Sequence, residues 1–258
     1  MKCELCWHRC GTDRSRSTGK CGIDNGIHIA HYGLHTGEEP FLTGTEGSGT
    51  IFFAGCTLKC AFCQNYQISR WRSGNHATEV LTITATMLAE IFMELKSMGA
   101  ANINLVSPTP YVPAIIDAVN IARSAGFDLP FIYTTHGYDT PGTIELLNGI
   151  IDIYLPDFKY GIDILGEELS GAPQMFSRCK ETMRAIYAQA GNLILDSSGL
   201  AVKGTVVRHL VLPGNIENSL NVLDFLERID RQINLSLMSQ FHPCGGLLSS
   251  HPELNRSL

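Results

Sequence analysis

The chain has 258 residues, of which 44% are hydrophobic and 17% charged, and its formal net charge is −6. This length and composition favour one large globular domain with a small appendage. The acidic balance gives no electrostatic reason to expect nucleic-acid binding, and no apolar run reaches the roughly 18 residues that a membrane-spanning helix needs.

The cysteine content points to metal binding. The chain has nine cysteines, and its first residues lack the apolar core of a secretory signal peptide. We therefore expect a reducing cytoplasm, where clustered thiols more often bind metals than form disulfides. Cys179 lies in a helical pattern and is expected to pack in the core, and Cys244 is expected to be chemically inert.

The first cysteines form a compact constellation in a segment that we assign to residues 1–45. The spacing of Cys3, Cys6, Cys10 and Cys21 is C-x2-C-x3-C-x10-C. Four thiolates fit a closed tetrahedral zinc site and could equally hold an iron–sulfur cluster. His8 is a candidate substitute ligand, although an exposed position suits it better. So short a segment buries little apolar area, so bound metal would supply its folding energy.

A second cysteine motif follows the apolar run at residues 50–55. Cys56, Cys60 and Cys63 have C-x3-C-x2-C spacing. Thiolates are soft ligands that hold iron–sulfur clusters, and three of them leave one iron of a four-iron cluster without a protein ligand. An open iron after a predicted strand indicates a reaction site. Structural zinc and free buried thiols are the alternatives, and the missing fourth ligand counts against zinc.

Short β-rich runs then alternate with helical patterns. A helix begins after the N-cap Thr84 and ends at Gly99, and another begins at Pro113 and ends at Gly126. Further helices are expected over 143–148, 174–189 and 218–231, and strands over 102–106, 130–135, 152–158, 202–212 and 235–239. Alternation of this kind predicts parallel strands with right-handed crossovers. Six such units predict an α/β fold for residues 46–258, a partial (β/α)6 TIM-like barrel that follows the small N-terminal cysteine-rich module.

Polar residues gather where the predicted strands end, which is where parallel barrels build their sites. Asp157 and Lys159 share one face of a strand, and burying either charge without a partner would be costly. They could pair with each other as a plain structural ion pair or contact a zwitterionic ligand. Arg208 suits a carboxylate, the turn at residues 107–109 could be an ordinary proline turn, and His242 could be structural.

Several segments together resemble one known family. They are residues 47–56, 63–66, 102–109, 152–160, 208–214 and 236–240. The chain resembles the radical S-adenosylmethionine (SAM) proteins related to pyruvate formate-lyase activating enzyme, especially the branch with an additional N-terminal cysteine set.

The resemblance implies a [4Fe–4S] cluster on Cys56, Cys60 and Cys63, with SAM chelating the fourth iron. It implies no catalytic side chain beyond the cluster ligands. The cofactor-binding residues that it implies are Phe62, Asn65, Ser107, Thr109, Thr135, Asp157, Lys159, Arg208 and His242. The chain departs from the family at two points. It lacks the glutamate of the Gly-Gly-Glu-type turn at residues 107–109, and it has Thr134 where the activating enzymes have an acidic residue beside a monovalent cation.

The implied function is reductive cleavage of SAM followed by hydrogen abstraction from a substrate. The substrate would be a glycine of a partner enzyme that becomes a glycyl radical, and the electron donor would be of the flavodoxin or ferredoxin type. Radical chemistry on a different protein or on a small molecule is the nearest alternative. A non-catalytic iron–sulfur carrier or redox sensor and a structural zinc protein are the alternatives from other classes.

Overall fold

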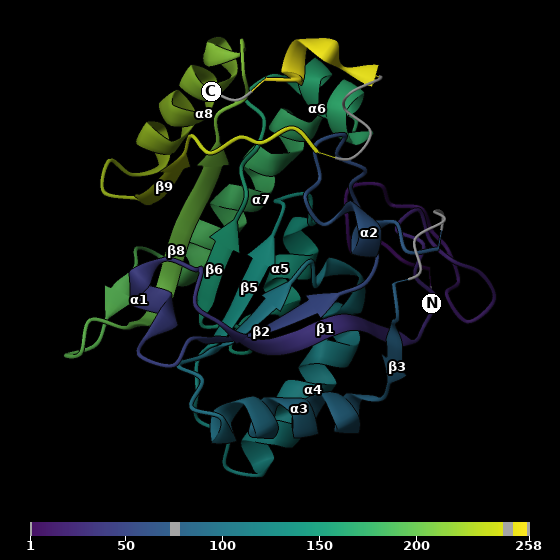
Figure 1. Ribbon diagram of the computed structural model, residues 1–258, viewed down its shortest axis with the longest axis vertical. Coiled ribbons are helices and arrows are strands. Elements are labelled where there is room, and N and C mark those ends of the chain that lie inside the picture. Colours follow the sequence, from purple (N-terminus) through teal and green to yellow (C-terminus); the bar gives the residue numbers. More distant parts are fainter. Residues whose placement is uncertain (1, 73–77, 245–249, 257–258) are drawn as a thin grey trace.

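Nine strands of the described residues form one mixed sheet in the computed structural model, which describes residues 2–72, 78–244 and 250–256 (Figure 1). The strand order is β3-β1-β2-β4-β5-β6-β8-β7, and β9 also pairs with β8. The mixed α/β class predicted from the sequence is therefore confirmed.

Six strands run parallel to their neighbours in the order in which they occur along the chain. They are β2 (Ser48–Phe53), β4 (Ile103–Val106), β5 (Phe131–Thr135), β6 (Ile153–Pro156), β8 (Ala201–Leu210) and β9 (Asn234–Met238). Each overlaps a strand expected from the sequence. Parallel strands that meet in register bring their carboxyl ends to one edge. The partial-barrel description stays a prediction, because strand order defines neighbours and not the curvature of the sheet.

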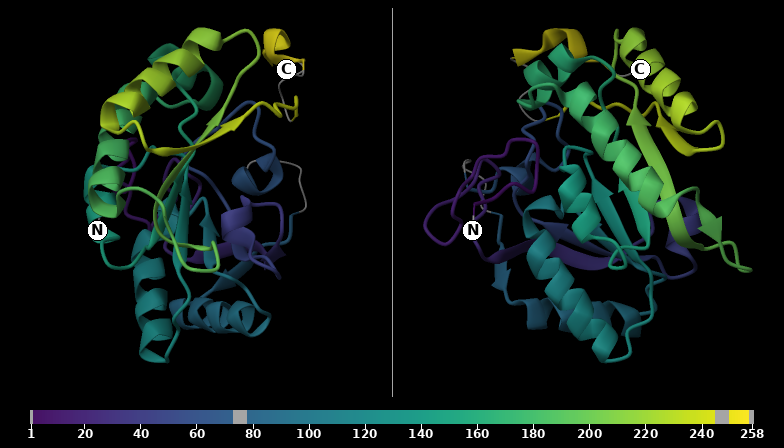
Figure 2. Two further views of the ribbon diagram at one scale, coloured as in Figure 1. Left: turned by 90° about the vertical axis from the view of Figure 1, so that its left-hand side faces the viewer. Right: turned by 180° about the vertical axis from the view of Figure 1, so that it is seen from behind.

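The helices follow the strands in alternation. They are α3 (Ala85–Ser97), α4 (Val112–Ser124), α5 (Pro141–Leu146), α6 (Asp163–Ser170), α7 (Met175–Ala190) and α8 (Ile216–Ile229), with short α1 (Pro40–Thr43) and α2 (Tyr66–Ser69). The predicted N-cap of α3 is confirmed, since Thr84 Oγ1 accepts a hydrogen bond from the Met87 amide at 3.2 Å. Helices α4, α5 and α7 lie behind the sheet in Figure 1, and the rear view in Figure 2 shows them in front of it. No helix among the described residues is long and apolar enough to cross a membrane.

Three strands were not expected from the sequence, two of them in the first half of the chain and the third, β7 (Ile194–Leu195), antiparallel to β8. β1 (Ile27–His35) pairs antiparallel with β2, and β3 (Leu81–Ile83) pairs antiparallel with β1. β1 falls within residues 1–45, so part of the segment assigned to the cysteine-rich module belongs to the main sheet. Histidines interrupt the apolar residues of β1, so a search for apolar runs does not find this strand. His28 is nevertheless buried, because Asp24 and Thr82 bond its two ring nitrogens at 2.7 and 3.0 Å.

The core lies between the central strands and the helices behind them. Buried side chains come from neighbouring parallel strands and include Ile51, Leu105, Phe131, Tyr133 and Tyr154. Each large apolar side chain removed from water contributes about 1.5–3 kcal/mol. This packing fixes the central strands, and therefore the positions of the loops at their carboxyl ends. Two short 3₁₀ helices, η1 (Thr109–Tyr111) and η2 (Pro252–Leu254), and strand β7 (Ile194–Leu195) complete the described elements.

Candidate functional site

A cavity of about 690 Å³ opens at the carboxyl ends of the parallel strands. Its wall includes eleven of the twelve residues that the sequence assigned to the main site. They are Cys56, Cys60, Phe62, Cys63, Asn65, Ser107, Thr135, Asp157, Lys159, Arg208 and His242. The volume lies within the range of about 300–1,000 Å³ that is typical of small-molecule sites. The cavity is therefore the candidate functional site.

The cysteine loop begins at a turn that only glycine can make. Gly55 has φ +75°, and a Cβ there would lie 2.5 Å from Ile23 Cδ1. After this turn the chain runs back against α6, since the amides of Lys59 and Ala61 donate to the carbonyls of Ser170 and Leu169 at 2.9 and 2.7 Å. The loop is thereby fixed at the cavity wall by the turn at Gly55 and by backbone hydrogen bonds from its middle to α6.

Hydrogen-bond donors surround the three sulfur atoms of this loop. The Leu58 amide donates to Cys56 Sγ at 3.4 Å, Ser170 Oγ donates to Cys60 Sγ at 2.9 Å, and Ser69 Oγ lies 3.5 Å from Cys63 Sγ. Burial raises the pKa values of the Cys56 and Cys60 thiols. The nearby Lys159 ammonium acts in the opposite direction, so both sulfurs face a cation that favours the thiolate.

The donor set fits an iron–sulfur cluster. Among the residues that the structure describes, no three His, Cys, Asp or Glu side chains lie close enough to chelate a single metal ion. A four-iron cluster separates its ligands more widely than a single ion does, since several irons and sulfides lie between them. Three thiols on one cavity wall, each near a hydrogen-bond donor, match what such a cluster requires of its protein ligands.

Asp157 and Lys159 form an ion pair in the cavity wall. Their side chains are only 29% and 18% exposed. Burial alone would lower the pKa of Lys159, but the charges of Asp157 and Cys60 raise it above its ordinary value. Both residues follow β6, which ends at Pro156, so they do not share a strand face as expected, but the mutual ion pair expected as one alternative is present. Lys159 stays cationic beside the thiols.

Arg208 has partners that the sequence did not indicate. Its Nε donates to Glu39 Oε1 at 2.9 Å, and its Nη2 contacts both Glu38 and Glu39. These two carboxylates follow β1 and reach across the cavity mouth to β8. The Arg208 guanidinium was expected to be available for SAM. It is instead engaged by two protein carboxylates. This pairing was not predicted, because β1, which precedes Glu38 and Glu39, was not among the expected strands.

Thr109 does not line the cavity, which corrects its assignment as a cofactor contact. It is fully buried in η1 and is not among the lining residues. The Tyr133 hydroxyl lies 3.4 Å from Thr109 Oγ1 and 2.7 Å from Asp139 Oδ1. Thr135 Oγ1 also donates to Asp139. Thr109 therefore belongs to a buried network around Asp139, a residue that the sequence analysis missed because nothing local marks its carboxylate as central.

Ser107 does lie in the cavity wall, in an unusual backbone conformation. Its φ is +59°, in the left-handed region that costs a non-glycine residue about 1–2 kcal/mol. The Ser107 amide donates to the Thr134 carbonyl at 3.1 Å, which holds the turn between β4 and η1. Such strain is concentrated at binding sites in proteins. At the adjacent position Thr134 Oγ1 donates to Asn104 Oδ1 at 2.6 Å, so its hydroxyl is already used within the sheet.

His136 is a cavity residue that was not among the predicted ligands. Its side chain lies between the cysteine loop and the Asp157–Lys159 pair, and the residue is 6% exposed. Its Nε2 is 2.8 Å from Thr57 Oγ1, and Nδ1 has no hydrogen-bond partner among the described residues. Burial, with a smaller effect from Lys159, lowers the pKa of His136 to about 3. The imidazole is therefore neutral at physiological pH.

The N-terminal cysteines also lie together. Arg14 Nη2 is 3.0 Å from Cys3 Sγ and 3.8 Å from Cys21 Sγ. A Cβ on Gly19 would lie 3.4 Å from the sulfurs of both Cys10 and Cys21. The charges of Cys3 and Cys21 also act on Cys6, whose pKa is raised mainly by burial. The sulfurs of Cys10 and Cys21 therefore both lie beside Gly19.

This cysteine cluster docks beside the cavity. Cys6 forms a β-bridge with Asp139, and the Trp7 amide donates to the Tyr138 carbonyl at 3.0 Å. His8 Nε2 lies 2.8 Å from the Thr57 carbonyl oxygen. The N-terminal segment thus contacts both the loop after β5 and the cysteine loop. His8 is engaged with the backbone there, so its expected exposure is wrong.

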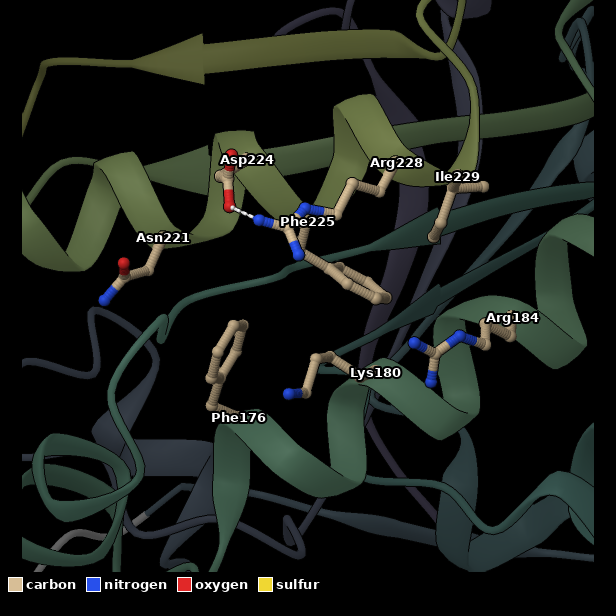
Figure 3. A pocket seen from close by; sticks show the side chains of 8 residues that line it. All are labelled: Phe176, Lys180, Arg184, Asn221, Asp224, Phe225, Arg228 and Ile229. Atoms are coloured by element: carbon tan, nitrogen blue, oxygen red, sulfur yellow. Dashed lines mark hydrogen bonds and ion pairs between the residues drawn. The ribbon is translucent and has the colours of Figure 1, made fainter.

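A second hollow of about 240 Å³ lies between α7 and α8 (Figure 3). Three cationic side chains, Lys180, Arg184 and Arg228, surround it with the rings of Phe176 and Phe225. Asp224 pairs with Arg228 at 2.6 Å. It contains no thiol and none of the predicted site residues, so the chemistry is assigned to the larger cavity.

Comparisons with known proteins do not assign a function. No family model matches the chain. An uncharacterized protein, MJ0674 of Methanocaldococcus jannaschii, is 29% identical over 260 residues, which cover 99% of this chain and 70% of that protein. Two crystal structures of Streptococcus suis SuiB, one bound to the precursor peptide SuiA, align with TM-scores of 0.46 and 0.45 and 16% identity. These alignments cover 70% of this chain, which spans about a third (36%) of the SuiB chain.

Proposed function

We propose that this chain is a radical SAM enzyme. In this proposal Cys56, Cys60 and Cys63 hold a [4Fe–4S] cluster, and SAM binds in the cavity beside them. The observation that carries the proposal is the meeting of three thiols with the Asp157–Lys159 pair on the wall of one cavity. A closed electron carrier has no use for a charged pair or for a cavity of this size, so the geometry favours an enzyme.

When bound, the cluster and SAM would supply one-electron reductive cleavage of SAM and hydrogen abstraction from the substrate. The protein residues bind and shield these groups. The Asp157 carboxylate can accept hydrogen bonds from an amino group, and the Lys159 ammonium offsets the negative charge of the thiolates. Phe62 packs against Phe241 and Tyr160, with ring centroids 5.8 and 6.4 Å apart, and presents an apolar surface next to Cys63.

The remaining predicted contacts keep their assignments within this proposal. Asn65, Ser107 and His242 line the cavity and would contribute polar contacts to SAM. Thr135 lines it too, but its hydroxyl donates to Asp139, so Thr135 would contact SAM only as an acceptor. Arg208 would contribute to the site together with Glu38 and Glu39, to which its guanidinium is bonded. A monovalent cation is not part of the proposal, because the Thr134 hydroxyl already donates to Asn104. We propose a protein substrate, in the first place a glycine of a glycyl radical enzyme, and a flavodoxin- or ferredoxin-type donor in the cytoplasm. A different protein or a small molecule is the alternative substrate.

The proposal is tested by incubating the iron-loaded protein with SAM and dithionite under anaerobic conditions. Accumulation of 5′-deoxyadenosine supports the enzyme. An intact reduced cluster that leaves SAM unchanged contradicts it and favours a carrier or sensor.

We also propose that Cys3, Cys6, Cys10 and Cys21 bind metal, either a second iron–sulfur cluster or one zinc ion, for which the four thiols would have to move closer together than they are in this structure. Replacing Cys56, Cys60 and Cys63 together with alanine should leave this metal in place, since the two cysteine sets are held by different loops. Elemental analysis and acid-labile sulfide measured on the triple variant separate zinc from a cluster. A triple variant that contains neither zinc nor iron would refute the N-terminal site.

A further inference from the structure

His136 occupies the cavity wall with one ring nitrogen paired and the other unpaired. Nε2 lies 2.8 Å from Thr57 Oγ1, while Nδ1 has no partner in the part of the chain that the structure describes. An unpaired buried polar atom costs about 1–3 kcal/mol, and native proteins retain few of them. A bound molecule that supplied the missing partner would remove this cost.

The neighbouring hydroxyl decides which nitrogen of His136 carries the proton. Thr57 is 4% exposed, and His136 Nε2 is the partner of its hydroxyl among the described residues. If Nε2 carried the proton, the Thr57 hydroxyl would accept a hydrogen bond from it, and the hydrogen of that hydroxyl would have no acceptor. If Thr57 donates to Nε2, both groups are satisfied and the proton of the neutral ring sits on Nδ1. Nδ1 is then a donor that needs an acceptor.

We propose that His136 is a binding residue, whose Nδ1–H donates a hydrogen bond to an oxygen atom of SAM. This inference rests on the proposed function. The carboxylate and ribose oxygens of SAM are the candidate acceptors, and the ammonium group is excluded because it has no lone pair. Lys159 stands near the same ring and favours its neutral form.

His136 also links the bound molecule to the cysteine loop. Thr57 directly follows Cys56, and its carbonyl oxygen is held by His8 of the N-terminal segment. A hydrogen bond from Nδ1 to SAM would therefore hold the ligand to the same unit that carries the first cluster thiol. A loop that is fixed in this way would keep the ligand at a constant position relative to the cluster.

The inference is tested by measuring SAM affinity calorimetrically on protein with an oxidised, reconstituted cluster. We expect His136→Phe to weaken SAM binding by about tenfold or more, in line with the loss of one buried hydrogen bond. His136→Gln keeps an N–H donor and should recover part of this loss. His31 lies on β1, is exposed and does not line the cavity, so His31→Phe should bind SAM as the wild type does.

The outcomes separate this inference from the proposed function. A wild type that does not bind SAM contradicts the function, whereas equal affinity in the wild type and His136→Phe overturns only the role of His136. If His136→Phe does not fold, the ¹⁵N spectrum of histidine-labelled wild-type protein decides. We expect the proton on His136 Nδ1 and a shift of that resonance when SAM is added. A proton on Nε2, or no shift, overturns the inference.

Discussion

Replacing Cys60 with alanine is expected to remove the cluster from the main cavity and to reduce SAM cleavage to background. Cys60 is buried, and its sulfur accepts a hydrogen bond from Ser170. Cys244 is another thiol near this loop, with its Sγ 3.4 Å from the Phe62 carbonyl oxygen, so Cys60→Ala is measured with and without Cys244→Ala. Iron and acid-labile sulfide contents, together with the visible absorption of the reconstituted protein, measure the loss.

Cys179→Ala is the matched control. Cys179 is also a buried thiol, but it packs in α7 against the helix and sheet core and does not line the cavity. This variant should keep the full iron content of the wild type and lose only some stability. Equal iron contents in Cys60→Ala and the wild type would contradict the assignment of the cluster ligands.

Removing one member of the Asp157–Lys159 pair is expected to have the second-largest effect. Lys159→Met leaves the Asp157 carboxylate beside the thiolates without its cation. Breaking a buried ion pair from one side costs about 3 kcal/mol, the lower end of the range for such pairs, because the remaining charge loses its partner. We expect a loss of this size in the free energy of unfolding measured with urea, and SAM binding should be lost with it.

The Arg123–Asp152 pair provides the control for this prediction. Its atoms lie 3.4 Å apart, and both side chains are 35% exposed at the opposite end of the sheet from the cavity. Arg123→Met should therefore lower stability by less than Lys159→Met and leave SAM affinity unchanged. A Lys159→Met protein with wild-type stability and SAM affinity would show that the pair is an ordinary surface interaction.

The sequence was informative where structure follows from local pattern. The cysteine spacing and the apolar run before Cys56 located the main site, and β-rich runs located all six parallel strands. Asp157 and Lys159 were recognisable because two charges in an apolar strand need partners. The meeting of these residues at one edge followed from parallel topology, which brings strand ends together whatever their separation along the chain.

The residues that the sequence did not reveal depend on contacts between distant segments. Glu38 and Glu39 reach Arg208 from a loop about 170 residues earlier in the chain, and no local pattern indicates that pairing. His136 was visible only as one polar residue in a turn, and its unpaired nitrogen emerges from the packing of Thr57 against it. Thr109 was misplaced because a strand-end hydroxyl can point into the core as easily as into a cavity.

Formation of 5′-deoxyadenosine from SAM distinguishes a radical SAM enzyme from an iron–sulfur carrier or sensor. The wild type and Cys60→Ala would be reconstituted anaerobically with iron and sulfide, reduced with dithionite, supplied with SAM and analysed by chromatography. We expect 5′-deoxyadenosine from the wild type and none above background from the variant. An intact, reduced wild-type cluster that produces none, with or without a candidate partner enzyme, would contradict the proposed radical SAM function.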